Sequence, residues 1–97
     1  MQINFTGQGM EVTEALRSIV NDKFKTIEHH FNHITHVNVI FKLERERVSH
    51  IAEINVHANG TEFNAHGISD NLYKAVDLMI HKLEKQMQKH KDKSRGE

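Results

Sequence analysis

Hydrophobic and polar residues follow two different periods near the amino terminus. Residues 2–6 alternate between polar and apolar, which predicts a short strand that the run Gly7-Gln8-Gly9 ends. From Thr13 onward the apolar residues recur at helical spacing, and Thr13 is a candidate N-cap. The pattern predicts a helix that ends at about His29 or His30. Its apolar residues are Ala15, Leu16, Ile19, Val20, Phe24 and Ile27.

Alternation returns in three runs, at residues 36–44, 48–58 and 61–66. The dipeptide Asn59-Gly60 separates the last two runs, and it predicts a tight hairpin turn because both residues accept a positive φ. Together the runs predict an antiparallel meander with one apolar face. The inward positions are Val37, Val39, Phe41, Leu43, Val48, His50, Ala52, Ile54, Val56, Ala58, Phe63 and Ala65.

A second amphipathic helix follows Ser69-Asp70, which is the candidate N-cap. Its apolar stripe consists of Leu72, Val76, Met79, Ile80, Leu83 and Met87. The order β-α-β-β-β-α predicts a two-layer α+β fold, with a four-stranded sheet and both helices packed on one face, as in double-stranded RNA-binding domains. We expect residues 1–90 to form a single domain and residues 91–97 to be a polar, basic tail that frays.

Composition limits the classes of protein to which the chain can belong. The length of 97 residues fits one domain, and the 37% of hydrophobic residues is typical of a folded, soluble chain. The absence of cysteine excludes disulfides, thiol nucleophiles and cysteine-based zinc sites. The amino terminus has neither the basic nor the apolar segment of a signal peptide, so we expect a cytoplasmic protein with no membrane partner.

Motifs for catalysis or cofactor binding do not emerge from the sequence. Gly7-Gln8-Gly9 lies between a strand and a helix, but the third glycine of a dinucleotide fingerprint would fall at Val12. The serines lie outside any G-x-S-x-G motif, and Glu44 and Glu46 alternate with arginines in a solvated turn. We predict that the protein is not an enzyme and uses no cofactor and no small-molecule substrate.

Nine histidines are the unusual feature of the composition. His29 and His33 have the i,i+4 spacing that can place two metal ligands on one side of a helix, which makes them weak candidates for an adventitious metal site. They lie near the predicted end of a helix, and no HExxH motif accompanies them. We predict no functional metal, and a histidine-based metal-binding protein is an alternative function.

The formal net charge is zero, with 13 basic and 13 acidic residues, but the charges are unevenly distributed. Residues 1–81 contain seven basic and ten acidic residues, whereas residues 82–97 contain six basic and three acidic residues. The zero total therefore conceals a basic carboxy-terminal segment, and a local basic surface is what nucleic-acid binding requires.

On a helical wheel, four lysines of the second helix lie opposite its apolar stripe, while Asp77 and Glu84 occupy one flank. These lysines are Lys74, Lys82, Lys85 and Lys89. One interpretation is a solvated helix face, and the other is a surface that follows a phosphate backbone. The candidate RNA-binding residues are Lys82, Lys85 and Lys89, then Lys91 and Lys93 beyond them, Lys74, and Arg17, Lys23 and Lys25 of the first helix.

Two segments resemble a known family. The run DNLYKAVDLMIHKLEKQMQKHKDK, residues 70–93, resembles the second helix of the bacterial ribosome hibernation promoting factors, in the family of ribosome-associated inhibitors and sigma-54 modulation proteins. The residues Ile3 to Gly7 and Val12 to Arg17 resemble that family's first strand and the entry to its first helix. The chain ends soon after the second helix, as in the family's short form.

The resemblance implies a stationary-phase factor that binds the small ribosomal subunit and its rRNA in the channel between head and body. Such a factor occludes mRNA and tRNA, inhibits translation and helps ribosomes pair as inactive dimers, with a second ribosome-modulating factor as a further partner. The order α-β-β-β-α leaves a general double-stranded RNA-binding module as an alternative function.

Overall fold

Four strands and two helices follow one another in the predicted order β-α-β-β-β-α. The elements are β1 (Asn4–Gln8), α1 (Glu14–His30), β2 (Ile34–Glu44), β3 (Ser49–Ala58), β4 (Thr61–Ser69) and α2 (Leu72–Arg95). This computed structural model describes residues 2–47 and 49–95. Within those ranges, neither helix has the length and hydrophobicity needed to cross a lipid bilayer.

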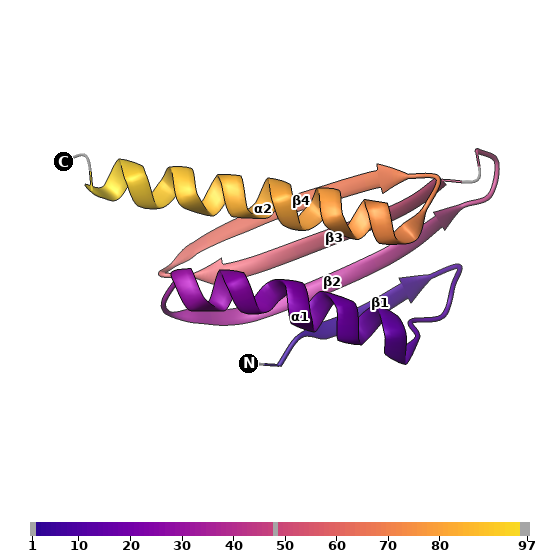
Figure 1. Cartoon of the computed structure of the whole chain (residues 1–97), viewed down its shortest axis with the longest axis horizontal. Coiled ribbons are helices and arrows are strands. Elements are labelled where there is room, and N and C mark those ends of the chain that lie inside the picture. Colours follow the sequence, from indigo (N-terminus) through magenta and orange to yellow (C-terminus); the bar gives the residue numbers. More distant parts are fainter. Residues whose placement is uncertain (1, 48, 96–97) are drawn as a thin grey trace.

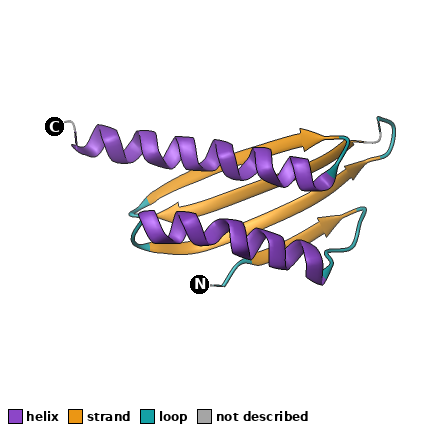
Figure 2. Ribbon diagram, viewed as in Figure 1, coloured by secondary structure: helices purple, strands orange, loops and turns teal. Residues whose placement is uncertain are grey.

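The four strands form one sheet in the order β1-β2-β3-β4. Strand β1 is parallel to β2, and the other neighbours are antiparallel. Both helices lie on one face of this sheet and run in the same direction, so the other face is uncovered (Figures 1 and 2). The predicted two-layer α+β fold is confirmed.

The hydrophobic core lies between the sheet and the two helices. Phe24 of α1, Phe41 of β2 and Leu83 of α2 are fully buried in it. The inward strand positions are buried as predicted, except that Leu43 and His50 are half-buried, and Val48 lies outside the described residues. The residues buried from α1 and α2 are Leu16, Val20, Phe24, Ile27, Ala75, Val76, Met79, Ile80, Leu83 and Met87.

The hairpin between β3 and β4 has the predicted two-residue turn. Asn59 and Gly60 have φ values of 53° and 72°, and Ala58 pairs with Thr61 directly beside the turn. Two successive positive φ values are typical of a type I′ turn, whose twist matches that of the strands that it joins.

Three strand boundaries differ from those that the sequence predicts. Strand β1 covers residues 4–8 instead of 2–6, because Gly7 and Gln8 continue the ladder by pairing with residues of β2. Strand β2 begins at Ile34 instead of His36, with a register shift between these residues. Strand β4 continues beyond His66 to Ser69 because residues 67–69 pair with β3.

The N-cap prediction is confirmed for α1 and is wrong for α2. Thr13 caps α1 as predicted, since its hydroxyl oxygen accepts from the Leu16 backbone N–H at 3.2 Å. The prediction of Ser69-Asp70 as the cap of α2 was wrong. The Asn71 side-chain oxygen accepts from the backbone N–H groups of Tyr73 and Lys74, at 2.8 and 3.3 Å. The helix then runs to Arg95 and includes much of the segment that the sequence assigns to a tail.

Candidate nucleic-acid interface

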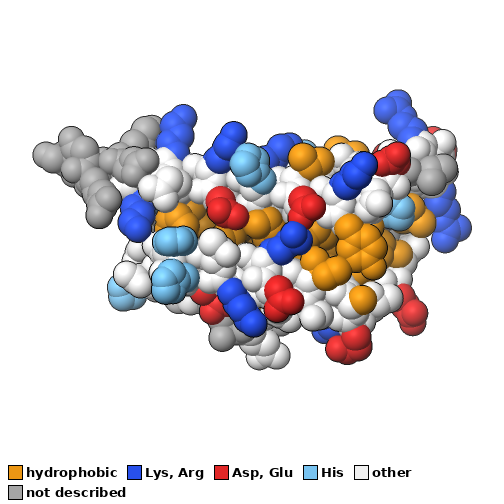
Figure 3. Space-filling model, viewed as in Figure 1, with side chains coloured by type: hydrophobic (Ala, Val, Ile, Leu, Met, Phe, Trp, Pro, Cys, Tyr) orange, Lys and Arg blue, Asp and Glu red, His pale blue; other side chains and the backbone are white. Residues whose placement is uncertain are grey.

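Three lysines of α2 form a continuous exposed row. Lys82, Lys85 and Lys89 are three and four residues apart, so they lie on one side of the helix, and all three are exposed. They extend over about 10 Å of the helix axis. The opposite side of α2 is buried in the core. Lys and Arg side chains project along the α2 edge of the molecule in Figure 3. We name Lys82, Lys85 and Lys89 the lysine row.

Lys74 lies on the same side of α2, about two turns before Lys82. Between these two lysines is Leu78, whose side chain is 43% exposed. Lys74 is also exposed, but this apolar residue separates it from the lysine row. The four lysines that the sequence places on one side therefore form a group of three and a single outlying residue.

No carboxylate forms an ion pair with the lysine row among the side chains described, at residues 2–47 and 49–91. Asp77 forms an ion pair with Lys23 of α1 instead, at 2.5 Å. Glu84 is half-buried and lines a groove between the two helices together with Thr26. Asp77 and Glu84 thus face α1, and the described part of the chain provides no ion-pair partner for the lysine row.

The three basic residues predicted on α1 do not join the lysine row. Lys23 holds its ammonium group against Asp77 between the helices, and Lys25 lies 3.4 Å from Asp22 on its own helix. The Arg17 guanidinium lies over the Phe5 ring, 5.4 Å from its centroid. Two of the three are therefore paired with acids, and the third packs against β1.

Lys91 points toward α1 and away from the lysine row. Its ammonium group donates to the backbone carbonyl of His30 at 3.0 Å and lies 5.4 Å from the centroid of the Phe31 ring. A cation at the carboxy-terminal end of α1 is favoured by the helix dipole. Lys93 also belongs to α2, but its side chain lies outside the described ones.

The histidines near the end of α1 lie close to one another. The rings of His29 and His30 lie edge to face, with their centroids 5.3 Å apart. His33 follows in the connection to β2 and has a backbone φ of 61°. Within the described part of the chain, no group of three or more metal-binding side chains gathers. The pair His29 and His33 therefore stays a weak prediction of an adventitious site.

A row of asparagines crosses the uncovered face of the sheet, and sequence reasoning missed it. The strand register pairs Asn4 with Asn38, Asn38 with Asn55 and Asn55 with Asn64. The Asn4 side-chain nitrogen donates to the Asn38 side-chain oxygen at 3.3 Å. Alternation places such residues on the outer face, but only the register aligns them. The row carries no net charge, so it is not an electrostatic counterpart of the lysine row.

Comparison with known proteins identifies relatives along almost the whole chain. Residues 3–95 match the family model described as Sigma 54 modulation protein / S30EA ribosomal protein. The ribosome hibernation promoting factor of Salmonella typhimurium is 43% identical over 93 residues, which cover 96% of each chain. The protein of the same name from Pseudomonas putida is 38% identical over 96 residues, covering 99% of this chain and 92% of the other.

Solved structures agree with these sequence matches. A ribosomal subunit interface protein from Coxiella burnetii superposes with a TM-score of 0.82 at 35% identity, covering 95% of this chain and 99% of the other. The Protein Y N-terminal domain of Thermus thermophilus also superposes with a TM-score of 0.82, at 25% identity, and the match covers 93% of this chain and 99% of the other. The matched relatives carry the names of ribosome-associated factors and not of enzymes. The chain belongs to the Sigma 54 modulation protein / S30EA ribosomal protein family.

Proposed function

We propose that this protein is a ribosome hibernation factor that binds the small ribosomal subunit through the rRNA backbone. In this proposal, the bound protein occludes the mRNA and tRNA channel, inhibits translation and promotes inactive ribosome dimers in stationary phase. A second ribosome-modulating factor takes part in dimer formation, and the protein acts in the cytoplasm, where ribosomes are. The names of the relatives support the ribosome as partner.

The observation that carries the proposal is the exposed lysine row. Its ammonium groups have no close carboxylate among the described residues, so they are available to replace the counterions of a phosphate backbone. Among the described phenylalanine and tyrosine residues, only Tyr73 is exposed, at 49%, so large rings that could stack on bases are scarce. The surface therefore favours recognition of backbone and shape over recognition of base sequence.

The direct experiment is co-sedimentation with purified small subunits after charge reversal. The variant Lys82→Glu/Lys85→Glu/Lys89→Glu should fold normally, because glutamate has a helix propensity similar to that of lysine and all three side chains are exposed. We expect it to be lost from the small-subunit fraction at physiological salt. It should also fail to inhibit translation in a reconstituted system and to increase the fraction of ribosome dimers on a gradient.

A charge-matched control uses the exposed turn between β2 and β3. Arg45→Glu/Arg47→Glu changes the net charge as much as Lys85→Glu/Lys89→Glu does. The two arginines belong to the β2–β3 turn and not to α2, which carries the lysine row. The arginine variant should keep most of the affinity, and the lysine variant should lose it. Equal losses would mean that overall charge, and not the lysine row, controls binding. Competition by a short RNA duplex as strong as by ribosomes would favour a general duplex-binding module.

A further inference from the structure

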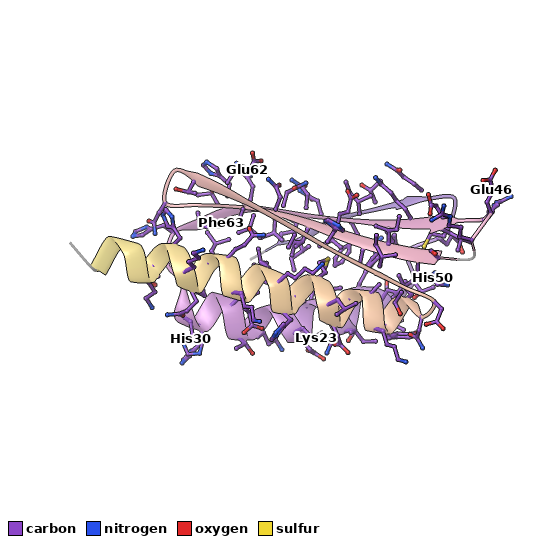
Figure 4. All side chains as sticks on the ribbon, turned by 90° about the horizontal axis from the view of Figure 1, so that it is seen from above. Lys23, His30, Glu46, His50, Glu62 and Phe63 are labelled. Atoms are coloured by element: carbon purple, nitrogen blue, oxygen red, sulfur yellow. The ribbon has the colours of Figure 1, made fainter. Side chains whose placement is uncertain are left out.

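A pocket of about 390 Å³ lies at the end of the molecule where α1 finishes. It is formed where the connection from α1 to β2, the β3–β4 hairpin and the last turns of α2 come together. His30 and Phe63, which belong to its lining, lie at the same end of the molecule in Figure 4. The hairpin is tied to the opposite wall, because the Asn59 backbone N–H donates to the His33 carbonyl at 3.3 Å. We name this cavity the end pocket.

The lining of the end pocket combines rings, amides and cationic groups. Phe31 and Phe63 supply aromatic surface. The rings of Phe63 and His90 lie edge to face, with their centroids 5.3 Å apart. Asn32 and Asn59 supply amide donors and acceptors. The described lining includes no carboxylate, so an anionic ligand meets no like charge there. Its volume is within the range of roughly 300–1,000 Å³ that small-ligand pockets occupy.

Lys91 supplies a positioned positive charge at the end pocket. Its ammonium group is held by the His30 carbonyl at 3.0 Å and lies over the Phe31 ring, and an ammonium with three donors can still donate to a phosphate oxygen. His30, His33 and His90 also line the pocket and offer further imidazole donors. Rings beside a fixed cation are the arrangement that recognises an unstacked base together with its phosphate.

The end pocket adjoins the lysine row through a second hollow. That hollow shares His30 and Phe31 with the end pocket and is lined on its other side by Lys85. Lys85 and Lys91 are about 9 Å apart along the axis of α2. A strand whose phosphates follow the lysine row can therefore reach the end pocket, although Glu84 in the connecting hollow keeps phosphates to the outer side.

We propose that the end pocket binds a single unstacked nucleotide of an RNA strand, with its base among the rings and its phosphate on Lys91. This proposal rests on the RNA-binding function proposed above. It adds base contacts to an interface that otherwise reads only the backbone, and it assigns Phe31, His90 and Lys91 a role that the lysine row does not have.

The test titrates the free full-length protein with adenosine and cytidine monophosphates and follows backbone amide signals by NMR. Saturable shifts should occur at residues of the end pocket, and the nucleosides and inorganic phosphate should each bind at least about tenfold more weakly, because each offers only part of the contacts. Lys91→Gln should weaken monophosphate binding about tenfold. His90→Gln changes an exposed residue and should weaken monophosphate binding severalfold. Phe31→Leu keeps an apolar side chain but removes the ring, and it should also weaken monophosphate binding severalfold.

Lys42→Gln is the matched control, because it removes one lysine charge of β2, which pairs with Glu53 at 3.1 Å and does not line the end pocket. It should leave monophosphate affinity unchanged. Shifts confined to the lysine row, phosphate binding as tight as that of the monophosphates, or wild-type affinity in Lys91→Gln would each overturn the proposal. Since this titration contains no ribosomes, the end pocket can fail while the lysine row still binds the small subunit. Monophosphate binding at the end pocket without small-subunit binding would support a site for free nucleotides and overturn the assignment to an RNA strand.

Discussion

Gly67 allows α2 to lie directly on strand β4. A Cβ atom at this position would come within 2.8 Å of the Leu78 Cβ and the Met79 nitrogen, and closer still to the Ala75 carbonyl oxygen. Two of these atoms belong to the helix backbone, which cannot rotate away as a side chain can. The missing side chain at one residue therefore fixes the separation between the helix that carries the lysine row and the sheet.

Gly67→Ala should lower the free energy of unfolding by about 1–3 kcal/mol, because the added methyl group forces the helix away from the sheet. Urea denaturation of the two proteins measures this difference. His66→Ala is the control, since His66 is exposed on the same strand, and it should change the free energy by less than about 0.5 kcal/mol. An unchanged unfolding midpoint in Gly67→Ala would contradict this close packing.

Single lysines differ in their contacts although they look alike in the sequence. The lysine row could be predicted, because helical spacing places Lys82, Lys85 and Lys89 opposite an apolar stripe. The contacts of Lys23 and Lys91 could not be predicted in this way. Lys23 meets Asp77 on the other helix, and Lys91 reaches a carbonyl 61 residues away in the sequence. Such partners depend on how the helices pack, which residue periodicity does not contain.

At the scale of elements, the order of strands and helices follows from periodicity, whereas their ends depend on tertiary pairing. Both helices have strong apolar stripes, and the Asn59-Gly60 turn is a local signal. The glycines at 7 and 67 look like strand breaks in the sequence. Both lie inside strands because their neighbours in the sheet, Phe41 and Ala52, continue the backbone ladder. The end pocket is missed for the same reason, since three distant segments form it.

The start of α2 provides a test at this scale. Asn71→Ala should lower the free energy of unfolding by about 1 kcal/mol, because two backbone N–H groups lose their acceptor. Asp70→Ala should cost less, since its carboxylate accepts from the Ser69 hydroxyl and from no backbone N–H of α2 in the described structure. Thermal denaturation of both variants compares them. A larger loss of stability in Asp70→Ala than in Asn71→Ala would contradict the cap at Asn71 and favour the Ser69-Asp70 cap that the sequence predicts.

At the scale of the whole molecule, the exposed lysines without an ion-pair partner among the described residues gather on one side of α2. The lysine row occupies the outer side of α2, the carboxylates Asp77 and Glu84 face the groove between the helices, and neutral asparagines cross the uncovered face of the sheet. A net charge of zero is thus compatible with RNA binding, because no described carboxylate forms an ion pair with the lysine row. Histidines gather at one end of the molecule, where the end pocket lies (Figure 3).

The salt dependence of small-subunit binding shows whether the lysine row contacts rRNA phosphates. The affinity of the wild-type protein and of Lys82→Gln/Lys85→Gln/Lys89→Gln is measured over a series of salt concentrations, by the same co-sedimentation assay. If each lysine of the row displaces counterions from rRNA phosphate, the slope of log affinity against log salt should become less steep by about 0.7–0.9 for each lysine removed. Parallel lines for the two proteins would contradict the account, because the lysine row would then make no phosphate contacts.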